Sequence, residues 1–335
     1  MNAPRNWRES LKSTIRNRLS DANVERAQII TRSLRDLRKT FDVVPPPRYP
    51  IAVAELKAAF VELGIGKGDI VHVHSSVSHL MRGATQPPSG SVPGIRSYSK
   101  AIIDVLIELV GADGTITMGT DFARPPGWLR RITANQELPG DVFDPATHPS
   151  NRGLVSEYFR KRPDVVRSLY PYYNVTAWGR HANELVKDHE RSTPYAQDAH
   201  SPWYKLTKMG GKVLLLGRTF DINSLVHLVE YLHPDEYPRP LFMSRPVSMG
   251  YLNRDGDRRN VDVLLHIAGA PGAGFFAPEA LFKFCEYING KYGVYRIRPF
   301  ADDVQIVCYD AMAQYDAFHR EMKQNVTWYD PDFLG

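Results

Sequence analysis

The chain has 335 residues, of which 43% are hydrophobic, and a formal net charge of +5 at pH 7. This length suits one elaborate α/β domain or two smaller ones, and the spread of basic residues without a nucleic-acid motif excludes a nucleic-acid partner. No run of about 18 uncharged apolar residues and no apolar N-terminal segment occurs, so we expect a cytoplasmic protein without a transmembrane helix or secretory signal.

The first 45 residues are predicted to form a separate basic helical arm. Leu11, Ile15 and Leu19 recur at helical spacing, arginine and lysine dominate the polar faces, and Val44–Pro47 reads as a stiff linker. The arm could pack on the body, or on a second subunit in a homodimer. It could also dock an acidic partner or a membrane surface.

The main domain, residues 46–335, alternates predicted strands and helices. A helix over 52–63, a strand over 69–74, a helix over 98–110 and a strand over 114–120 follow one another. This order predicts an α/β fold with a central, largely parallel sheet flanked by helices.

The second half of the domain is predicted to be mixed. Residues 247–251 and 260–266 resemble a hairpin, residues 278–288 a helix, and the end of the chain a mixed α+β region. Cys285 and Cys308 lack metal-ligand spacing, so we expect buried or half-buried thiols and no metal.

The stretch from Gly210 to His233 carries the strongest local signal. Val213–Leu216 is an apolar run between glycines, which is typical of a strand buried on both faces. Asp221 and Asn223 are good N-caps for a helix that starts at about Ser224.

His227 and Glu230 lie three residues apart on that helix, so their side chains point the same way. A histidine in this position sits where α/β proteins place their chemistry, and a neutral imidazole can accept a proton. The alternative is a core histidine that hydrogen-bonds a backbone carbonyl.

Taken in order, several segments resemble the aminoglycoside 3-N-acetyltransferase family, whose members use acetyl-CoA. The resemblance covers roughly residues 51–264, with "LGIGKGD…VHSSV" and "GADGTITM" near its start. It continues through the middle block and the strand and helix above, at Phe143–Thr147, Gly153–Glu157, Arg167–Ser168, Gly211–Gly217 and His227–Glu230.

The resemblance implies an acyl-CoA-dependent N-acyltransferase with CoA as co-substrate. The CoA pyrophosphate would lie at the turn after the strand over 69–74, since short hydroxyls and backbone N–H groups suit phosphate oxygens. The implied CoA-side residues are His74, Ser75, Ser76, Val77, Met118 and Thr120. Without the family, Ser75 and Ser76 would read as a simple turn.

The resemblance also assigns the acid–base groups. His227 aligns with the catalytic histidine, as a general base that takes a proton from the acceptor amine. Glu230 follows as its partner, with a structural or helix-surface carboxylate as the alternative. The implied substrate-side residues are His189, Tyr170, Asn174 and His266, of which Tyr170 and Asn174 replace a histidine and a serine of the family pattern.

The largest departure from the family lies after Asp262. Resistance enzymes carry a glutamate and an aspartate there, whereas residues 264–269 of this chain contain no carboxylate. Polycationic drugs need paired acids in the cleft. We therefore expect a small non-aminoglycoside acceptor, such as an amino sugar or a biosynthetic intermediate.

The sequence is also compatible with two other functions. The chain could be a non-catalytic member of the fold in a biosynthetic assembly, docking through its N-terminal helices. It could also use a different donor, with a longer acyl group or with the phosphopantetheine of an acidic carrier protein in place of CoA, and the basic arm would suit such a carrier.

Overall fold

The computed structural model describes residues 48–87, 92–217, 220–237, 240–266, 278–301, 304–330 and 333. The predicted arm over residues 1–45 lies outside the described residues.

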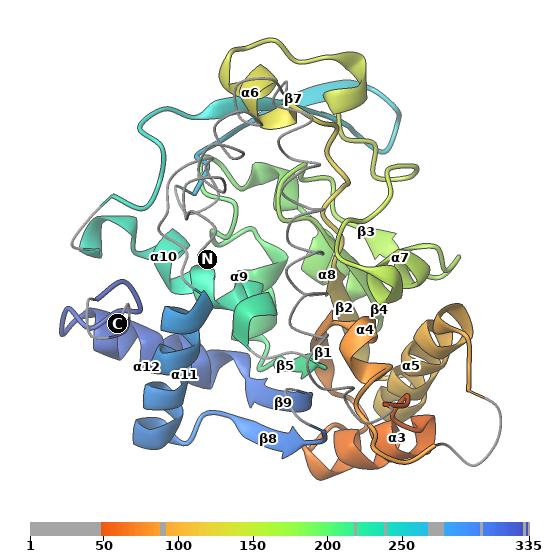
Figure 1. The fold of residues 1–335 in the computed structure, drawn as a ribbon. Coiled ribbons are helices and arrows are strands. Elements are labelled where there is room, and N and C mark those ends of the chain that lie inside the picture. Colours follow the sequence, from red (N-terminus) through yellow and green to blue (C-terminus); the bar gives the residue numbers. More distant parts are fainter. Residues whose placement is uncertain are drawn as a thin grey trace, which may run out of the picture.

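A seven-stranded mixed sheet forms the centre of the fold, in the order β3-β4-β2-β1-β5-β9-β8 (Figure 1). Among the described strands, parallel pairing is confined to β1 with β2 and β1 with β5. The other four pairings are antiparallel. The strands are β1 Ile70–Ser75, β2 Thr115–Gly119, β3 Val166–Arg167, β4 Val175–Gly179, β5 Lys212–Leu216, β8 Arg296–Pro299 and β9 Gln305–Asp310.

The prediction of a largely parallel sheet is therefore wrong outside the three central strands. On one side β4 returns antiparallel to β2, and on the other the C-terminal strand β9 runs antiparallel to β5. A buried strand shows the same apolar run in either direction. The direction of the flanking strands could not be read from the residues themselves.

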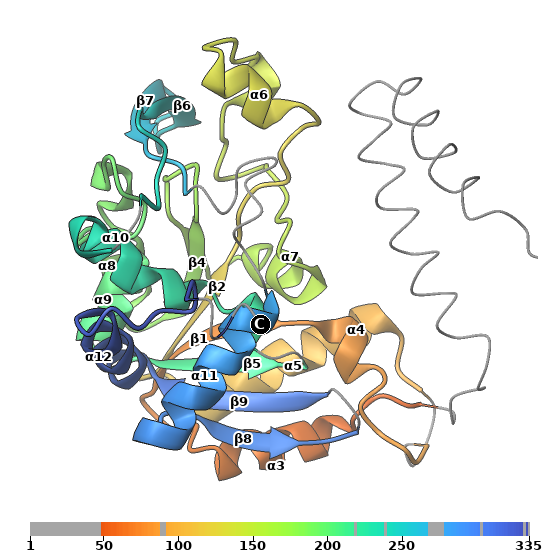
Figure 2. The ribbon, with the colours of Figure 1, turned by 60° about the vertical axis from the view of Figure 1, so that its left-hand side comes forward.

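Helices cover both faces of the sheet (Figure 2). On one face, α3, α5 and α7 share an apolar core with Val71 and Val73 of β1, while α9, α11 and α12 belong to the core on the other face, with Val213 and Leu215 of β5. The helices are α3 Val53–Glu62, α4 Val77–Leu80, α5 Ile95–Val110, α6 Trp128–Thr133, α7 Leu154–Arg160, α8 Ala182–Val186, α9 Pro202–Lys208, α10 Leu228–Leu232, α11 Pro278–Tyr292 and α12 Ala311–Met322.

The predicted hairpin is confirmed as the separate two-stranded pair β6 Val247–Leu252 and β7 Arg258–Val263. It lies beyond one end of the main sheet, beside α6, in Figure 1. Cys285 and Cys308 are buried free thiols, as expected. No helix in the described part of the chain is long and apolar enough to cross a membrane.

Side-chain alternation along β1 separates a packing face from a chemical face. Val71 and Val73 enter the core under α3 and α5. His72 and His74 point to the opposite face, where their rings lie 4.4 and 6.1 Å from the ring of Trp203 on α9. This second face carries the candidate site.

Candidate active site

A cavity of about 460 Å³ lies beyond the carboxyl ends of the three central strands. Residues that end or follow β1, β2 and β5 form much of its wall, which is where open α/β sheets bind ligands. The lining residues are Val73, His74, Ser75, Gly119, Asp121, Asn151, Arg152, Gly153, Ser156, Tyr172, Tyr173, Trp203, Ile222, Asn223, Ser224, His227 and His266.

His227 lies in this wall because the turn after β5 leads into the short helix that carries it. Asn223 is the N-cap, and its Oδ1 accepts a hydrogen bond from the backbone N–H of Leu225 at 3.0 Å. The helix begins at Ser224, as predicted, with a 3-10 turn over Ser224–His227 that leads directly into α10. Asp221, the other predicted cap, lies in the preceding 3-10 turn Phe220–Ile222.

Glu230 is the centre of the polar cluster behind His227. One carboxylate oxygen, Oε2, lies 2.6 Å from His227 Nδ1 and 2.8 Å from His266 Nε2. The hydroxyl of Tyr329 donates to the other oxygen, Oε1, at 2.6 Å. Glu230 has no exposed surface, so the helix-surface reading of this carboxylate is wrong.

The surrounding groups keep Glu230 ionised. Burial alone would raise its pKa, but the charges of His266 and His227 and their hydrogen bonds outweigh burial and lower the pKa to about 2. The carboxylate thus fixes the orientation of the His227 ring.

The predicted CoA-side residues divide into two groups. His74 and Ser75 line the cavity, whereas the others are not among the described residues that do. Ser76 donates its N–H to the carbonyl of Leu216 at 2.8 Å, and its hydroxyl lies 2.7 Å from His79 Nδ1. Val77 begins α4, and Met118 is fully buried in the core under α3 and α5.

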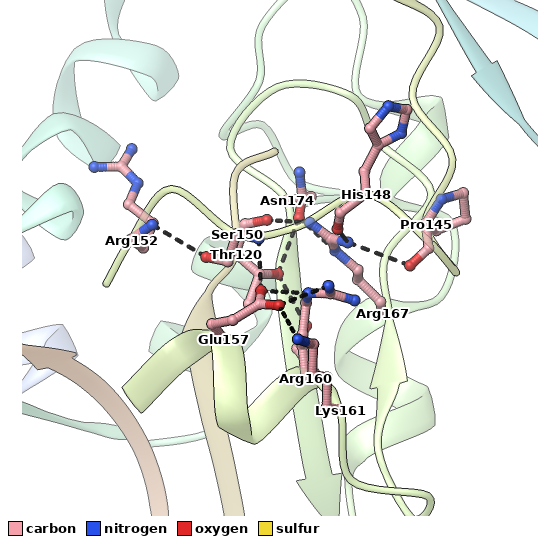
Figure 3. A network of polar contacts seen from close by, with 11 residues as sticks. Thr120, Pro145, His148, Ser150, Arg152, Glu157, Arg160, Lys161, Arg167 and Asn174 are labelled. Atoms are coloured by element: carbon pink, nitrogen blue, oxygen red, sulfur yellow. Dashed lines mark hydrogen bonds and ion pairs between the residues drawn. The ribbon is translucent and has the colours of Figure 1, made fainter. Parts of the chain in front are cut away.

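Thr120 and Asn174 belong to a polar network beside the cavity (Figure 3). The Thr120 hydroxyl donates to Asn174 Oδ1 at 2.9 Å, and Arg167 Nε donates to the same oxygen at 2.9 Å. Arg167 also donates to the carbonyls of Thr120 and His148. This network joins the ends of β2, β3 and β4, and neither Thr120 nor Asn174 is among the described residues that line the cavity.

Two more of the predicted substrate-side residues are packed in the core. Tyr170 and His189 are fully buried, with stacked rings 4.6 Å apart. His189 Nδ1 lies 3.0 Å from Ser168 Oγ, and its Nε2 lies 3.2 Å from the carbonyl of Ala196. His266 is thus the one member of the predicted substrate-side set that lines the cavity within the described chain.

An ion pair in the cavity wall was missed by the sequence reading. Arg152 donates from Nε to Asp121 Oδ2 at 2.7 Å, and its Nη2 contacts the same oxygen. The Asp121 side chain is 5% exposed and that of Arg152 is 42% exposed. In Figure 3 the Arg152 guanidinium points away from the neighbouring polar network. Arg152 sits in the middle block of the resemblance, but no local pattern distinguished it from a surface arginine.

Aromatic residues complete the wall, and one of them has an unusual backbone. Tyr173 has φ +56°, a left-handed conformation that bulky residues rarely adopt and that often marks functional sites. Its ring lies 5.9 Å from the Arg152 guanidinium and 6.1 Å from the ring of Tyr231, next to Glu230 in sequence. Tyr329 was also missed, because it lies outside the region of resemblance and carries no local signal.

Comparisons with known proteins identify the family of this chain. Residues 73–296 match the family model described as aminoglycoside 3-N-acetyltransferase. The SPbeta prophage-derived aminoglycoside N(3')-acetyltransferase-like protein YokD of Bacillus subtilis is 32% identical over 214 residues, which cover 59% of this chain and 70% of that protein. Aminoglycoside N(3)-acetyltransferase VIII of Streptomyces fradiae is 32% identical over 212 residues, covering 60% and 68%.

The solved structures show the same fold. The structure described as AAC-IIIb binary with CoASH has a TM-score of 0.63 at 23% identity, and the match covers 82% of this chain and 97% of that one. The family match itself spans well over half of the sequence. The chain therefore belongs to the aminoglycoside 3-N-acetyltransferase family of acetyl-CoA-dependent N-acetyltransferases.

Proposed function

We propose that this protein transfers an acetyl group from acetyl-CoA to the amine of a small non-aminoglycoside acceptor, with His227 as general base. The observation that carries the proposal is the 2.6 Å contact between His227 Nδ1 and the buried Glu230 carboxylate, at the wall of the cavity. A histidine oriented by a buried carboxylate is a recurrent acid–base arrangement.

His227 and Glu230 would have different roles in the transfer of the acetyl group. Acetyl-CoA supplies the acetyl group as a thioester, whose C–S bond breaks as the C–N bond of the amide forms, and the CoA sulfur leaves as a thiol after taking the amine proton from His227. His227 Nε2 accepts the proton that the attacking amine loses as the C–N bond forms. Glu230 stabilises the resulting imidazolium without itself becoming protonated.

We assign the CoA end of the cavity to the β1 turn. His74 and Ser75 line it, and Gly153, whose φ is +96°, brings the start of α7 against the Ser75 carbonyl. A Cβ added at Gly153 would lie 3.9 Å from that oxygen. Ser76, Val77, Met118 and Thr120 are not among the described residues that line the cavity, so we do not assign them a direct contact with CoA.

The charge of the cavity favours an acceptor with few cationic groups. Among the described lining residues, Asp121 is the one carboxylate, and it is neutralised by Arg152. The Arg152–Asp121 pair offers a polycation no net negative charge, and no other acid in the described wall would pair with its ammonium groups. Antibiotic modification is thus not the role that this wall suits best.

A matched pair of acceptors tests the proposal. Thiol release from acetyl-CoA would be followed with glucosamine, which has one amine, and with kanamycin, a polycationic aminoglycoside. We expect glucosamine to have the higher kcat/KM, by about tenfold or more, because several ammonium groups would be desolvated without an unpaired acid to compensate them.

Two different results would contradict two different parts of the proposal. A preference for kanamycin would overturn the acceptor class. Absence of thiol release with either amine, together with normal CoA binding by calorimetry, would favour the non-catalytic alternative. Arg152→Gln sharpens the test, since loss of the guanidinium should shift the ratio of the two kcat/KM values towards kanamycin.

A further inference from the structure

A second cluster of histidine and carboxylate side chains lies where the end of α10 meets α12. His233 directly follows α10, Glu236 ends the 3-10 turn Pro234–Glu236, and His319 lies on α12. One ligand atom from each residue lies within 4.8 Å of the other two. No step of the proposed acetyl transfer uses these groups.

Local sequence brings the first two residues together. Pro234 starts the 3-10 turn, which returns Glu236 to His233 so that Oε1 lies 2.6 Å from Nδ1. The Glu236 side chain is 46% exposed, which leaves room for water molecules beside it. The His233 side chain is 20% exposed.

The third proposed ligand atom, Nε2 of His319, makes no hydrogen bond in the described structure. This nitrogen is buried, and it lies 3.8 Å from Glu236 Oε2. A buried unpartnered imidazole nitrogen costs free energy.

An outer hydrogen bond completes the arrangement. His233 Nε2 lies 2.7 Å from the hydroxyl of Tyr315, one helical turn before His319 on α12. Metal-binding histidines commonly use their second nitrogen in this way, which fixes the ring. The two imidazole rings are stacked with centroids 3.9 Å apart, so metal binding requires them to turn about their Cβ–Cγ bonds until both nitrogens face one ion.

We propose that His233 Nδ1, Glu236 and His319 Nε2 bind one divalent transition-metal ion, with Zn²⁺ as the best match. Two imidazoles, one carboxylate and water form a ligand set that zinc accepts. The ion would join the segment after α10 to α12. The chain then continues from α12 to Tyr329, the residue that contacts Glu230.

Calorimetric titration of the EDTA-treated full-length protein with Zn²⁺ tests this site. We expect wild type to bind zinc, and His319→Ala and Glu236→Gln to lose one ion per chain while keeping wild-type circular dichroism. Tyr315→Phe should weaken this binding by about tenfold, the cost of removing an outer-shell partner.

Two controls separate this site from other histidines. His181 and Glu184 form a similar pair, at 3.1 Å, without a third ligand in the described structure, so His181→Ala should bind zinc as wild type does. Glu230→Gln disrupts the His227–Glu230–His266 cluster, which is also compact enough to hold an ion. It should leave the proposed site intact.

The proposal is overturned if wild type binds no zinc, if folded His319→Ala retains the full stoichiometry, or if zinc binding is lost only in Glu230→Gln. None of these results depends on acetyl transfer.

Discussion

His227 and His189 both match histidines of the family pattern, yet they occupy contrasting regions. His189 is fully buried, and both of its ring nitrogens are hydrogen-bonded. Burial lowers the pKa of its imidazole to about 3. His227 lies in the cavity wall against an ionised, fully buried carboxylate. A catalytic base needs both access to substrate and a partner for its positive charge, and we propose His227 rather than His189 as the base because His227 has both.

The largest expected effect separates the two histidines by activity. His227→Ala should lower kcat/KM for acetyl transfer by a factor of about 10² to 10⁴, because the amine proton loses its acceptor, while CoA binding by calorimetry stays unchanged.

His189→Gln is the matched substitution in the other region. It should leave kcat of the folded protein unchanged and lower the free energy of unfolding by about 1–3 kcal/mol, measured with urea, since buried hydrogen bonds are disturbed. A large loss of kcat in His189→Gln, or full activity in His227→Ala, would contradict the assignment of His227, and not His189, as the base.

Glu230→Gln should lower kcat by a factor on the order of 10², because the neutral amide cannot stabilise the imidazolium. It should also flatten the pH dependence of stability. The pKa of Glu230 falls from its ordinary 4.5 to about 2 on folding, so its contribution is fully present above pH 4.5 and is lost as pH falls towards 2.

That contribution is on the order of 3 kcal/mol, since each pKa unit corresponds to about 1.4 kcal/mol. Urea unfolding of wild type and Glu230→Gln between pH 5 and pH 2.5 measures it. Parallel stability curves for the two proteins would show that the carboxylate is not held ionised as the geometry indicates.

The smallest change in activity is expected for Tyr329, whose hydroxyl donates to Glu230. Tyr329→Phe removes the 2.6 Å hydrogen bond to Glu230 Oε1 but leaves both histidine contacts in place. We expect kcat to fall by about three- to tenfold and the acid-induced loss of stability to begin at a higher pH, as a less stabilised carboxylate protonates more readily.

Tyr170→Phe is the control, because the buried Tyr170 hydroxyl has no hydrogen-bond partner among the described residues. It should leave kcat and the pH dependence of stability unchanged. If both tyrosine variants behaved alike, Tyr329 would have no specific role in holding Glu230.

Much of the local structure could be predicted from the residues. The apolar run at 213–216 forms β5, Asn223 caps the helix that begins at Ser224, and the 247–263 segment forms a hairpin. These predictions succeeded because each depends on neighbours within a few positions. Spacing also placed His227 and Glu230 on the same side, and their 2.6 Å contact is the outcome.

Other features were decided by the tertiary structure alone. His266 and Tyr329 reach Glu230 from 36 and 99 positions away, and no local pattern encodes such contacts. Met118 and His189 match the family yet face the core, since the side of the sheet or loop to which a residue turns depends on what packs against it. Local sequence was enough to predict the strand, the cap and the His–Glu pair. Packing over long separations determined which side chains share their cavity and which carboxylate stays ionised.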